Sequence, residues 1–139
     1  MEKKKTMSKR ILIVEDDLFM RMLLEYNLKK AGYHISAANN GHKGLKIAKK
    51  EKPDLIISDV NMSKLNGFEL CQKLREDFDT KLIPIILLTS NSQIQDKLKG
   101  FKSGADDYIT KPFHLEEFLA RVHSLLERRN SPAQEADMD

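Results

Sequence analysis

The chain contains the stretch Ile11-Leu-Ile-Val-Glu-Asp-Asp17, in which four consecutive aliphatic residues are followed at once by three carboxylates. An uninterrupted aliphatic run without a period of two is typical of a strand that is buried on both faces. Such strands occur in parallel sheets whose two faces are covered by helices. The stretch therefore predicts a parallel sheet with an acidic cluster at the carboxyl end of one strand.

Three further apolar runs end in residues that suit a metal or a phosphoryl group. They are Leu55–Ser58 before Asp59, Ile83–Leu88 before Thr89 and Ser90, and Tyr108–Thr110 before Lys111 and Pro112. Open α/β sheets bind their ligands outside the carboxyl ends of their strands. We therefore expect carboxylates, a hydroxyl and an ammonium to gather at one edge of the sheet.

Segments with a helical spacing of apolar residues separate these runs, and a weaker strand at residues 33–38 completes the alternation. The expected helices contain Leu18–Ala31, Leu45 with Ala48, Leu70 with Leu74 and Phe78, Ile94 with Leu98 and Phe101, and Leu115–Leu126. Asp17 and Gly32 suit the two ends of the first helix. Five strand-helix pairs predict a doubly wound α/β fold, a five-stranded parallel sheet with helices on both faces.

Size and composition indicate one domain with a single core, since the chain has 139 residues. Lys and Arg number 24 against 21 Asp and Glu; the excess comes largely from the N-terminal lysines, so we expect no nucleic-acid binding by this chain. No apolar run is long enough to cross a membrane, and a single cysteine, Cys71, fits a reducing, cytoplasmic compartment. We expect a disordered basic tail at residues 1–8, the domain at 9–129, and a polar tail or linker start at 130–139.

The acidic residues Glu15, Asp16 and Asp59 are expected to meet at the sheet edge. Three carboxylates held together repel one another unless a cation neutralises them. Their ligand atoms are hard oxygens, and neither Cys nor His belongs to the cluster. Mg²⁺ or Mn²⁺ therefore fits this set, whereas Zn²⁺ does not.

Asp59 could serve as a metal ligand only, or also as a nucleophile toward phosphorus. A carboxylate can form an acyl phosphate where the charge on the transferring group is cancelled from several sides. Lys111 supplies a compact positive charge for that purpose. Thr89 offers a hydroxyl to a phosphoryl oxygen, and the small Ser90 leaves room for the group. The set predicts binding of a phosphoryl group on Asp59.

Four motifs carry a resemblance to a known family. They are Ile11–Asp17, Pro53–Met62, Leu88–Ser90 and Gly104–Phe113. From about residue 9 to residue 129, the chain resembles the receiver domain of bacterial two-component response regulators. The resemblance implies a flavodoxin-like fold with strand order 2-1-3-4-5. It also implies a function in phosphorelay signal transduction, as a phosphoacceptor rather than as an enzyme.

The resemblance assigns roles to the residues at the strand ends. Asp59 is expected to accept the phosphoryl group from a sensor histidine kinase or a phosphotransfer protein. The expected Mg²⁺ ligands are Glu15, Asp16, Asp59 and the backbone carbonyl of Asn61. Lys111 is expected to contact the phosphoryl group, and the peptide bond before Pro112 is expected to be cis.

A switch is also implied by the resemblance. Thr89 and Tyr108 match a pair in which the hydroxyl is drawn toward the phosphoryl group and the aromatic ring turns inward. This change reshapes the face built from the fourth helix, the fifth strand and the fifth helix. The chain departs from the family at Ser63, where Pro is usual.

Charged residues on that face resemble the set that regulators of the winged-helix, DNA-binding subfamily use to form dimers. They are Lys97, Asp106, Asp107, Glu117, Arg121 and Arg128. Opposite charges could cross-pair about a two-fold axis, so we hypothesise a homodimer that phosphorylation favours. A solvated charged surface is the alternative.

Two asparagines lie close to where a water would attack the phosphoryl group. Asn61 follows Asp59 by two residues, and Asn91 follows Thr89 by two residues. We expect a change at either position to alter the rate of phosphoryl loss.

The residues of the sheet edge fit three other functions less well than they fit a phosphoacceptor. An aspartyl phosphatase usually has a second acid two residues after its nucleophile, where this chain has Asn61. A flavin-binding electron carrier cradles phosphate in its first loop, whereas this loop is rich in carboxylates. A pure interaction module would not need Asp16, Asp59, Thr89 and Lys111 together.

Overall fold

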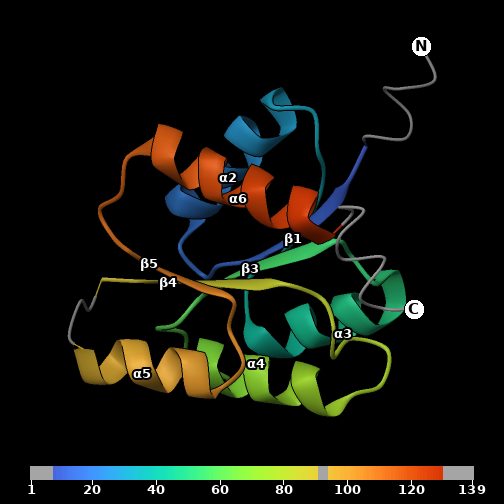
Figure 1. Cartoon of the computed structure of the whole chain (residues 1–139), viewed down its shortest axis with the longest axis vertical. Helices are drawn as coiled ribbons and strands as arrows, with labels where there is room; N and C mark the ends of the chain where they lie inside the picture. Colours follow the sequence, from blue (N-terminus) through green and yellow to red (C-terminus); the bar gives the residue numbers. More distant parts are fainter. Residues whose placement is uncertain (1–7, 91–93, 130–139) are drawn as a thin grey trace.

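The computed structural model describes residues 8–90 and 94–129 (Figure 1). Within these residues, the strands are β1 (Arg10–Val14), β2 (His34–Ala38), β3 (Leu55–Asp59), β4 (Ile85–Thr89) and β5 (Asp107–Thr110). The helices are α2 (Leu18–Lys30), α3 (Gly41–Glu51), α4 (Gly67–Glu76), α5 (Ile94–Lys102) and α6 (Leu115–Arg129). The alternation of strands and helices agrees with the prediction.

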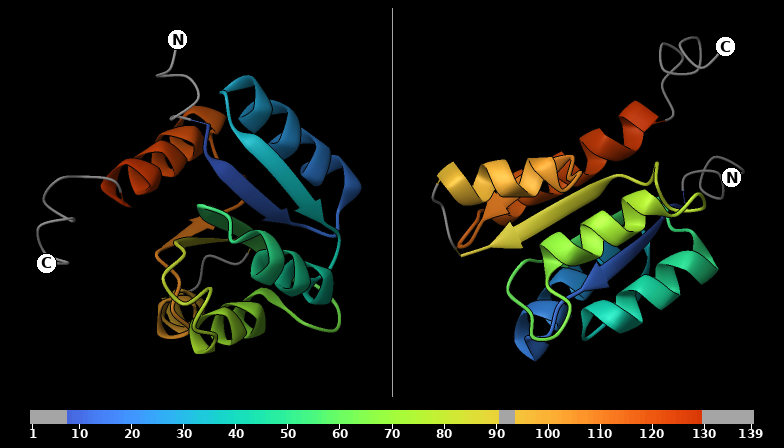
Figure 2. Two further views of the ribbon diagram at one scale, coloured as in Figure 1. Left: turned by 90° about the vertical axis from the view of Figure 1, so that its right-hand side faces the viewer. Right: turned by 90° about the horizontal axis from the view of Figure 1, so that it is seen from below.

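All strands lie in one parallel sheet, in the order β2-β1-β3-β4-β5. Helices α2 and α6 cover one face, and α3, α4 and α5 cover the other (Figure 1). The left view of Figure 2 shows the arrows of β1 and β2 running in the same direction. The doubly wound, flavodoxin-like fold is thus confirmed. Because the strand order reverses between β1 and β3, the binding crevice of such a sheet lies beyond their carboxyl ends.

The sheet is buried on both faces, which explains why β1 and β3 lack an alternation of apolar and polar residues. On one face, Ile13 packs with Leu24 of α2 and Phe118 of α6. On the other face, Leu12 packs with Leu70 of α4. Each strand therefore contributes side chains to two separate hydrophobic layers, one under each set of helices.

Both predicted ends of α2 are confirmed. The Asp17 carboxylate accepts a hydrogen bond from the Met20 backbone N–H at 2.8 Å, which satisfies one of the free donors of the first turn. Gly32 has φ of 104°, a conformation that glycine adopts without strain after a helix end. Asp17 is consequently a helix cap and not one of the clustered acids.

Three predicted features differ from the structure. Phe78 lies beyond the end of α4 and is 82% exposed, because the backbone leaves the helix and becomes extended at Asp77. Strand β4 begins at Ile85, two residues later than expected, since the Ile83 N–H is used in a turn with Thr80. The apolar residues of α5 do not all face the core, and Leu98 is about half exposed.

Several expectations fall outside the described residues. The structure does not describe most of the two predicted tails, since residues 1–7 and 130–139 lie outside the described part. Asn91 lies outside it as well. Among the described residues, no helix is long and apolar enough to cross a membrane. Cys71 is fully buried, and burial raises the pKa of its thiol.

Candidate phosphoacceptor and metal site

The strand ends bring the predicted residues to one edge of the sheet. Asp59, the last residue of β3, pairs with Leu88 of β4. Thr89 follows Leu88 and pairs with Thr110 of β5, and the Lys111 N–H donates to the Thr89 carbonyl. The parallel register therefore places the acid, the hydroxyl and the ammonium on neighbouring strands.

A carboxylate cluster occupies this edge. Glu15, Asp16 and Asp59 each offer an oxygen, and these oxygens all lie within 4.8 Å of one another. Glu15 and Asp59 are 1% and 4% exposed, whereas Asp16 is exposed. The cluster thus has two buried acids and one that reaches solvent. An all-oxygen set of this kind suits a hard divalent cation such as Mg²⁺.

Lys111 is bound to both buried acids. Its ammonium lies 3.0 Å from Oδ1 of Asp59 and 3.3 Å from Oε1 of Glu15. The peptide bond between Lys111 and Pro112 is cis, as predicted. The lysine side chain is 20% exposed, so the pair is shielded from water and its electrostatic attraction is strong.

The charges of the site are only partly balanced. Burial, followed by the charge of Asp59, raises the pKa of Glu15. Burial, together with the charge of Asp16, raises the pKa of Asp59 despite its hydrogen bond to Lys111. Burial opposes the charge of Lys111, but Asp59 and Glu15 prevail and raise the lysine pKa. Three carboxylates facing one ammonium leave an excess of negative charge that a divalent cation would neutralise.

Two residues that hold the site were missed in the sequence. The guanidinium of Arg21 donates to the Glu15 backbone carbonyl at 2.8 Å, which fixes the acidic loop to the first turn of α2. Gly67 lies so close to β3 that a Cβ atom there would be 2.5 Å from the Asp59 carbonyl oxygen. The role of Arg21 could be suspected because this residue lies one helical turn after the cap residue Asp17. The role of Gly67 depends on a contact between α4 and β3, and the local sequence gives no sign of that contact.

The remaining predicted site residues occupy different environments. Thr89 is 1% exposed, and its hydroxyl accepts a hydrogen bond from the Asn61 side-chain amide at 3.3 Å. Ser90 is exposed beside it. The Tyr108 ring is buried against α5, where a Cβ atom on Gly100 would come within 2.7 Å of it. The ring therefore already points inward in this structure.

The charged residues of the proposed dimer face are largely paired within the chain. Arg121 lies 2.8 Å from Asp107 and 3.0 Å from Glu117. Asp106 lies 2.9 Å from Arg75 of α4, a partner that the sequence did not suggest. Arg128 is exposed. The side chain of Lys97 lies outside the described part of the structure.

The metal-free protein is expected to lose stability as the pH rises above the ordinary pKa values of 3.8 for Asp59 and 4.5 for Glu15. Below these values, both carboxyls are protonated in the folded and the unfolded chain. Above them, the unfolded chain releases protons that the folded chain still holds, because the folded-state pKa values are raised. Rising pH therefore favours unfolding until the folded-state pKa values are passed. Urea unfolding with a chelator at several pH values measures this fall.

An Asp59→Asn variant is the matched control for this expectation. It keeps the shape of the side chain but removes one buried charge, so it should be more stable than the wild type at neutral pH without metal. Its stability should also fall less with pH, and Mg²⁺ should stabilise it less. A variant that is less stable than the wild type under these conditions would contradict the role given to charge repulsion.

Comparison with known proteins agrees with this geometry. The family model described as "Response regulator receiver domain" matches residues 11–123. The chain is 50% identical over 127 residues to "DNA-binding dual master transcriptional regulator RpaA" of Synechocystis sp., covering 91% of this chain and 53% of that protein. It is 43% identical over 132 residues to "Alkaline phosphatase synthesis transcriptional regulatory protein PhoP" of Bacillus subtilis, covering 95% and 54%. The chain thus spans about half the length of these curated relatives.

A solved structure is similar over the same region. It is the receiver domain of the sensor histidine kinase PA1611 from Pseudomonas aeruginosa, with a TM-score of 0.80 and 26% identity, covering 86% of this chain and 98% of that one. That structure is described as having a magnesium ion coordinated in its active site cleft. The family model covers most of the described fold and all the clustered residues. The chain belongs to the response regulator receiver domain family and acts in phosphorelay signalling.

Proposed function

We propose that Asp59 is the residue that accepts the phosphoryl group. The observation that carries this proposal is the buried Asp59 carboxylate, held 3.0 Å from the Lys111 ammonium within a cluster of three carboxylates. Burial keeps water away from an acyl phosphate, and the ammonium cancels charge that the phosphoryl group brings. Glu15 is buried beside Asp59, but the Lys111 ammonium lies closer to Asp59, at 3.0 Å against 3.3 Å for Glu15, so Asp59 is the better acceptor.

The proposed metal ligands are Glu15, Asp16, Asp59 and the backbone carbonyl of Asn61. The PA1611 receiver domain, with its magnesium ion, supports Mg²⁺ as the metal. Mn²⁺ is a possible substitute because it accepts the same oxygen ligands. When bound, the cation supplies charge neutralisation to the phosphoryl oxygens.

In the proposed reaction, a carboxylate oxygen of Asp59 attacks the phosphorus of a phosphohistidine. A P–O bond forms while the P–N bond breaks, and the histidine ring keeps the electron pair of the broken bond and takes up a proton. Lys111 stays close to the developing charge. Thr89 donates its hydroxyl hydrogen to a phosphoryl oxygen of the product, and this contact is the proposed start of the switch that includes Tyr108.

Mass spectrometry after incubation with Mg²⁺ and acetyl phosphate tests the proposed acceptor. The wild type should gain the mass of one phosphoryl group, and the gain should disappear with a metal chelator. The Asp59→Asn variant keeps the shape of the site and should gain nothing. A phosphoryl group on Asp59→Asn at the wild-type level would place the acceptor elsewhere.

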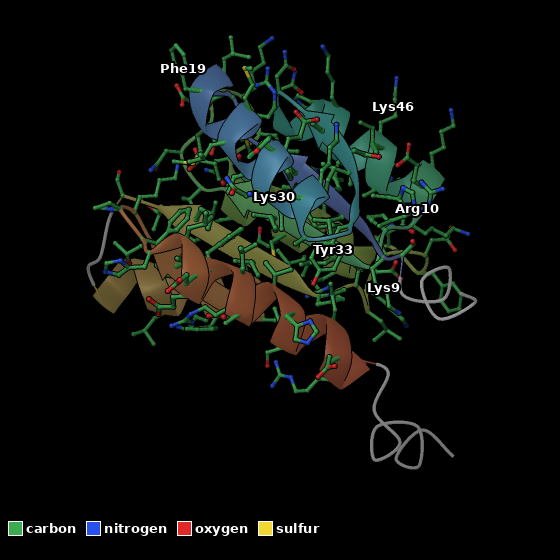
Figure 3. All side chains as sticks on the ribbon, turned by 90° about the horizontal axis from the view of Figure 1, so that it is seen from above. Lys9, Arg10, Phe19, Lys30, Tyr33 and Lys46 are labelled. Atoms are coloured by element: carbon green, nitrogen blue, oxygen red, sulfur yellow. The ribbon has the colours of Figure 1, made fainter. Side chains whose placement is uncertain are left out.

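The phosphodonor is proposed to be a histidine kinase or phosphotransfer protein that docks on α2. The start of this helix follows the acidic loop directly, and it carries apolar side chains that face solvent. They are Leu18, Phe19, Met22, Leu23 and Tyr26, which are 49–81% exposed. Figure 3 shows Phe19 projecting away from the start of α2. An exposed apolar patch beside a reactive site is typical of a protein-binding surface.

A Phe19→Ser variant is expected to slow phosphoryl transfer from a partner phosphohistidine protein by about tenfold, because loss of an interface aromatic residue commonly costs more than 1 kcal/mol of binding. Phosphorylation by acetyl phosphate should not change, since that donor needs no docking surface. Phe78→Ser is the matched control, because Phe78 is equally exposed, at 82%, on a loop after α4. Equal slowing by both variants, or slowing with acetyl phosphate, would contradict the proposed surface.

A homodimer that phosphorylation favours is proposed for the face formed by α5, β5 and α6. Its residues are Lys97, Asp106, Asp107, Glu117, Arg121 and Arg128. Asp107, Glu117 and Arg121 already form an intrachain cluster, so they would have to exchange or share partners across a two-fold axis. Light scattering with beryllofluoride and Mg²⁺ tests this, and a monomer at high protein concentration would refute it.

The longer relatives support a wider proposal for the whole protein. Two of them are named as transcriptional regulators, so we propose a cytoplasmic regulator in which this domain receives the phosphoryl signal. We propose that residues 9–129 do not bind nucleic acid directly. The lysines at the start of the chain lie outside the described residues.

A further inference from the structure

The inward ring of Tyr108 fills a space that exists because residue 100 has no side chain. A Cβ atom added to Gly100 would lie 2.7 Å from Cδ1 and 2.9 Å from Cε1 of the ring, closer than non-bonded carbon atoms pack. Gly100 is a buried residue inside α5. A helix interior favours alanine over glycine, so the ring, and not the helix, explains the glycine.

The end of α5 that carries Gly100 is tied in place. The Gly100 carbonyl accepts a hydrogen bond from the Ser103 hydroxyl at 2.6 Å and another from the Ala105 N–H at 3.2 Å. The ring of the next residue, Phe101, lies 6.4 Å from the Tyr108 ring, centroid to centroid. Because these contacts hold the helix over β5, a side chain at position 100 would displace the ring more readily than the helix.

The ring and the switch hydroxyl lie on the same face of the sheet. Tyr108 pairs with Leu87 of β4, and both side chains belong to the hydrophobic layer on the side of α3, α4 and α5 (Figure 1). Thr89 lies two residues after Leu87 in the same strand, and side chains with this spacing point to the same face. The Thr89 side chain therefore continues the layer that contains the ring.

We propose that Gly100 is a positioning residue of the switch, because its missing side chain admits the Tyr108 ring to its inward place. This inference rests on the proposed function of Asp59 and deepens it, since it concerns how the phosphoryl signal reaches α5. In the proposed switch, the inward ring accompanies the phosphoryl group. A change that disfavours the inward ring must then weaken binding of a phosphoryl mimic by the same factor, since coupling between two sites is reciprocal.

Gly100→Ala is expected to push the ring outward. It should bind beryllofluoride, a mimic of the phosphoryl group, about tenfold more weakly than the wild type in the presence of Mg²⁺, an effect of the usual size for coupled sites. Calorimetric titration of the full chain measures this affinity. Lys102→Ala, a change at an exposed residue of α5, is the control and should leave the affinity unchanged.

Fluorescence reports the position of the ring without any phosphoryl group. The chain has three tyrosines and no tryptophan, so Tyr26→Phe and Tyr33→Phe together leave Tyr108 as its single fluorescent residue. Acrylamide should quench this fluorescence more strongly after Gly100→Ala, because an outward ring is accessible to the quencher. Lys102→Ala should leave the quenching unchanged. A loss of stability alone would not alter the exposure of the ring in the folded protein.

A Tyr108→Ala background separates the proposed role from other effects of the added methyl group. Without the ring, the Cβ atom at position 100 has Leu87 as its nearest listed neighbour, at an ordinary contact distance of 3.5 Å. Gly100→Ala should then leave beryllofluoride affinity unchanged. It should also raise the melting temperature in this background, because alanine is the better helix former, although it lowers the melting temperature of the wild type.

Greater quenching, with weaker beryllofluoride binding that disappears in the Tyr108→Ala background, supports the inference. Unchanged quenching, unchanged or tighter binding, or the same loss of affinity in both backgrounds overturns it. If Gly100→Ala does not fold, recovery of folding by Tyr108→Ala supports the close contact, and continued unfolding refutes it. Failure of the wild type to bind beryllofluoride and to be phosphorylated would reject the proposed function of Asp59 instead, whereas the quenching would still decide whether Gly100 places the ring.

Discussion

Replacing Lys111 with methionine is expected to lower the rate of phosphorylation by acetyl phosphate about 100-fold to 1,000-fold, the usual effect of losing one preorganised electrostatic contact to a reacting group. The ammonium lies 3.0 Å from Oδ1 of Asp59 and has little access to water. Methionine keeps much of the length of the side chain but has no charge. The phosphoryl group would then bring its negative charge into a buried site that already holds two acids.

The same change should affect the carboxyls themselves. Without the ammonium, the pKa values of Glu15 and Asp59 should rise further, because Lys111 is the positive partner that lowers both. A larger share of Asp59 would then be protonated and unable to attack phosphorus. This loss should be partly reversed at higher pH, which distinguishes it from a loss caused by misfolding.

Phosphorylation rates at several pH values, measured by mass spectrometry, check these expectations. Lys111→Arg keeps a positive charge and should be less impaired than Lys111→Met. Lys46→Met removes an exposed lysine of α3 (Figure 3) and should leave the rate unchanged. A rate for Lys111→Met within threefold of the wild type would refute the role assigned to the ammonium.

Replacing Arg75 with alanine is expected to destabilise the domain by about 3 kcal/mol, because each of the partly buried carbonyls of Ile83 and Gly104 loses its donor and an acceptor left without a donor costs about 1–3 kcal/mol. Arg75 lies in the last turn of α4, and its side chain is 22% exposed. Its guanidinium donates to the carbonyls of Lys81, Ile83 and Gly104 and to the carboxylate of Asp106 at 2.6–2.9 Å. One side chain thus joins α4, the loop before β4 and the loop before β5.

The loss should be large because alanine leaves several acceptors without their donor. The Asp106 carboxylate also accepts the Ile85 N–H at 2.8 Å, so it would remain partly bound but would lose its positive partner. For a domain of this size, a loss of about 3 kcal/mol lowers the melting temperature by about 10 °C.

Thermal unfolding followed by circular dichroism measures the change. Arg75→Lys keeps the charge but cannot form the same forked set of hydrogen bonds. It should therefore lower the melting temperature less than Arg75→Ala does, but still below that of the wild type. Arg128→Ala, a change at an exposed arginine of α6, should stay within about 0.5 kcal/mol of the wild type. Similar melting temperatures for Arg75→Ala and Arg128→Ala would show that the bonds of Arg75 contribute little.

The strands and the site were predictable because they depend on local signals. An aliphatic run such as residues 11–14 can be buried on both faces only in a covered sheet, and parallel strands necessarily end at one edge. Glu15 and Lys111 follow their strands directly, and Asp59 and Thr89 are the last residues of theirs, so strand prediction places them together. The cap at Asp17 is equally local, since it needs only its own side chain and the next turn.

Contacts between distant segments were not predictable in this way. The Arg75 contacts depend on where α4 ends relative to the loops before β4 and β5. From sequence alone, an arginine near a helix end is ordinarily expected to lie on the surface. Phe78 was assigned to the helix on spacing alone, although the chain leaves the helix at Asp77. The grouping of Asp106 with the dimer face likewise overlooked a partner 31 residues away in the sequence.

Arg75 and Asp106 tie β4 and β5 together near the strand beginnings, whereas Thr89 and Lys111 lie at the opposite, carboxyl ends. The two strands are therefore held together at their amino ends, whereas a phosphoryl group would act at their carboxyl ends. Strands held in this way should move most at their carboxyl ends and least at their amino ends. A charge added at Asp59 should accordingly displace the carboxyl ends of β4 and β5. The amino edge of the sheet should remain a fixed reference for that displacement.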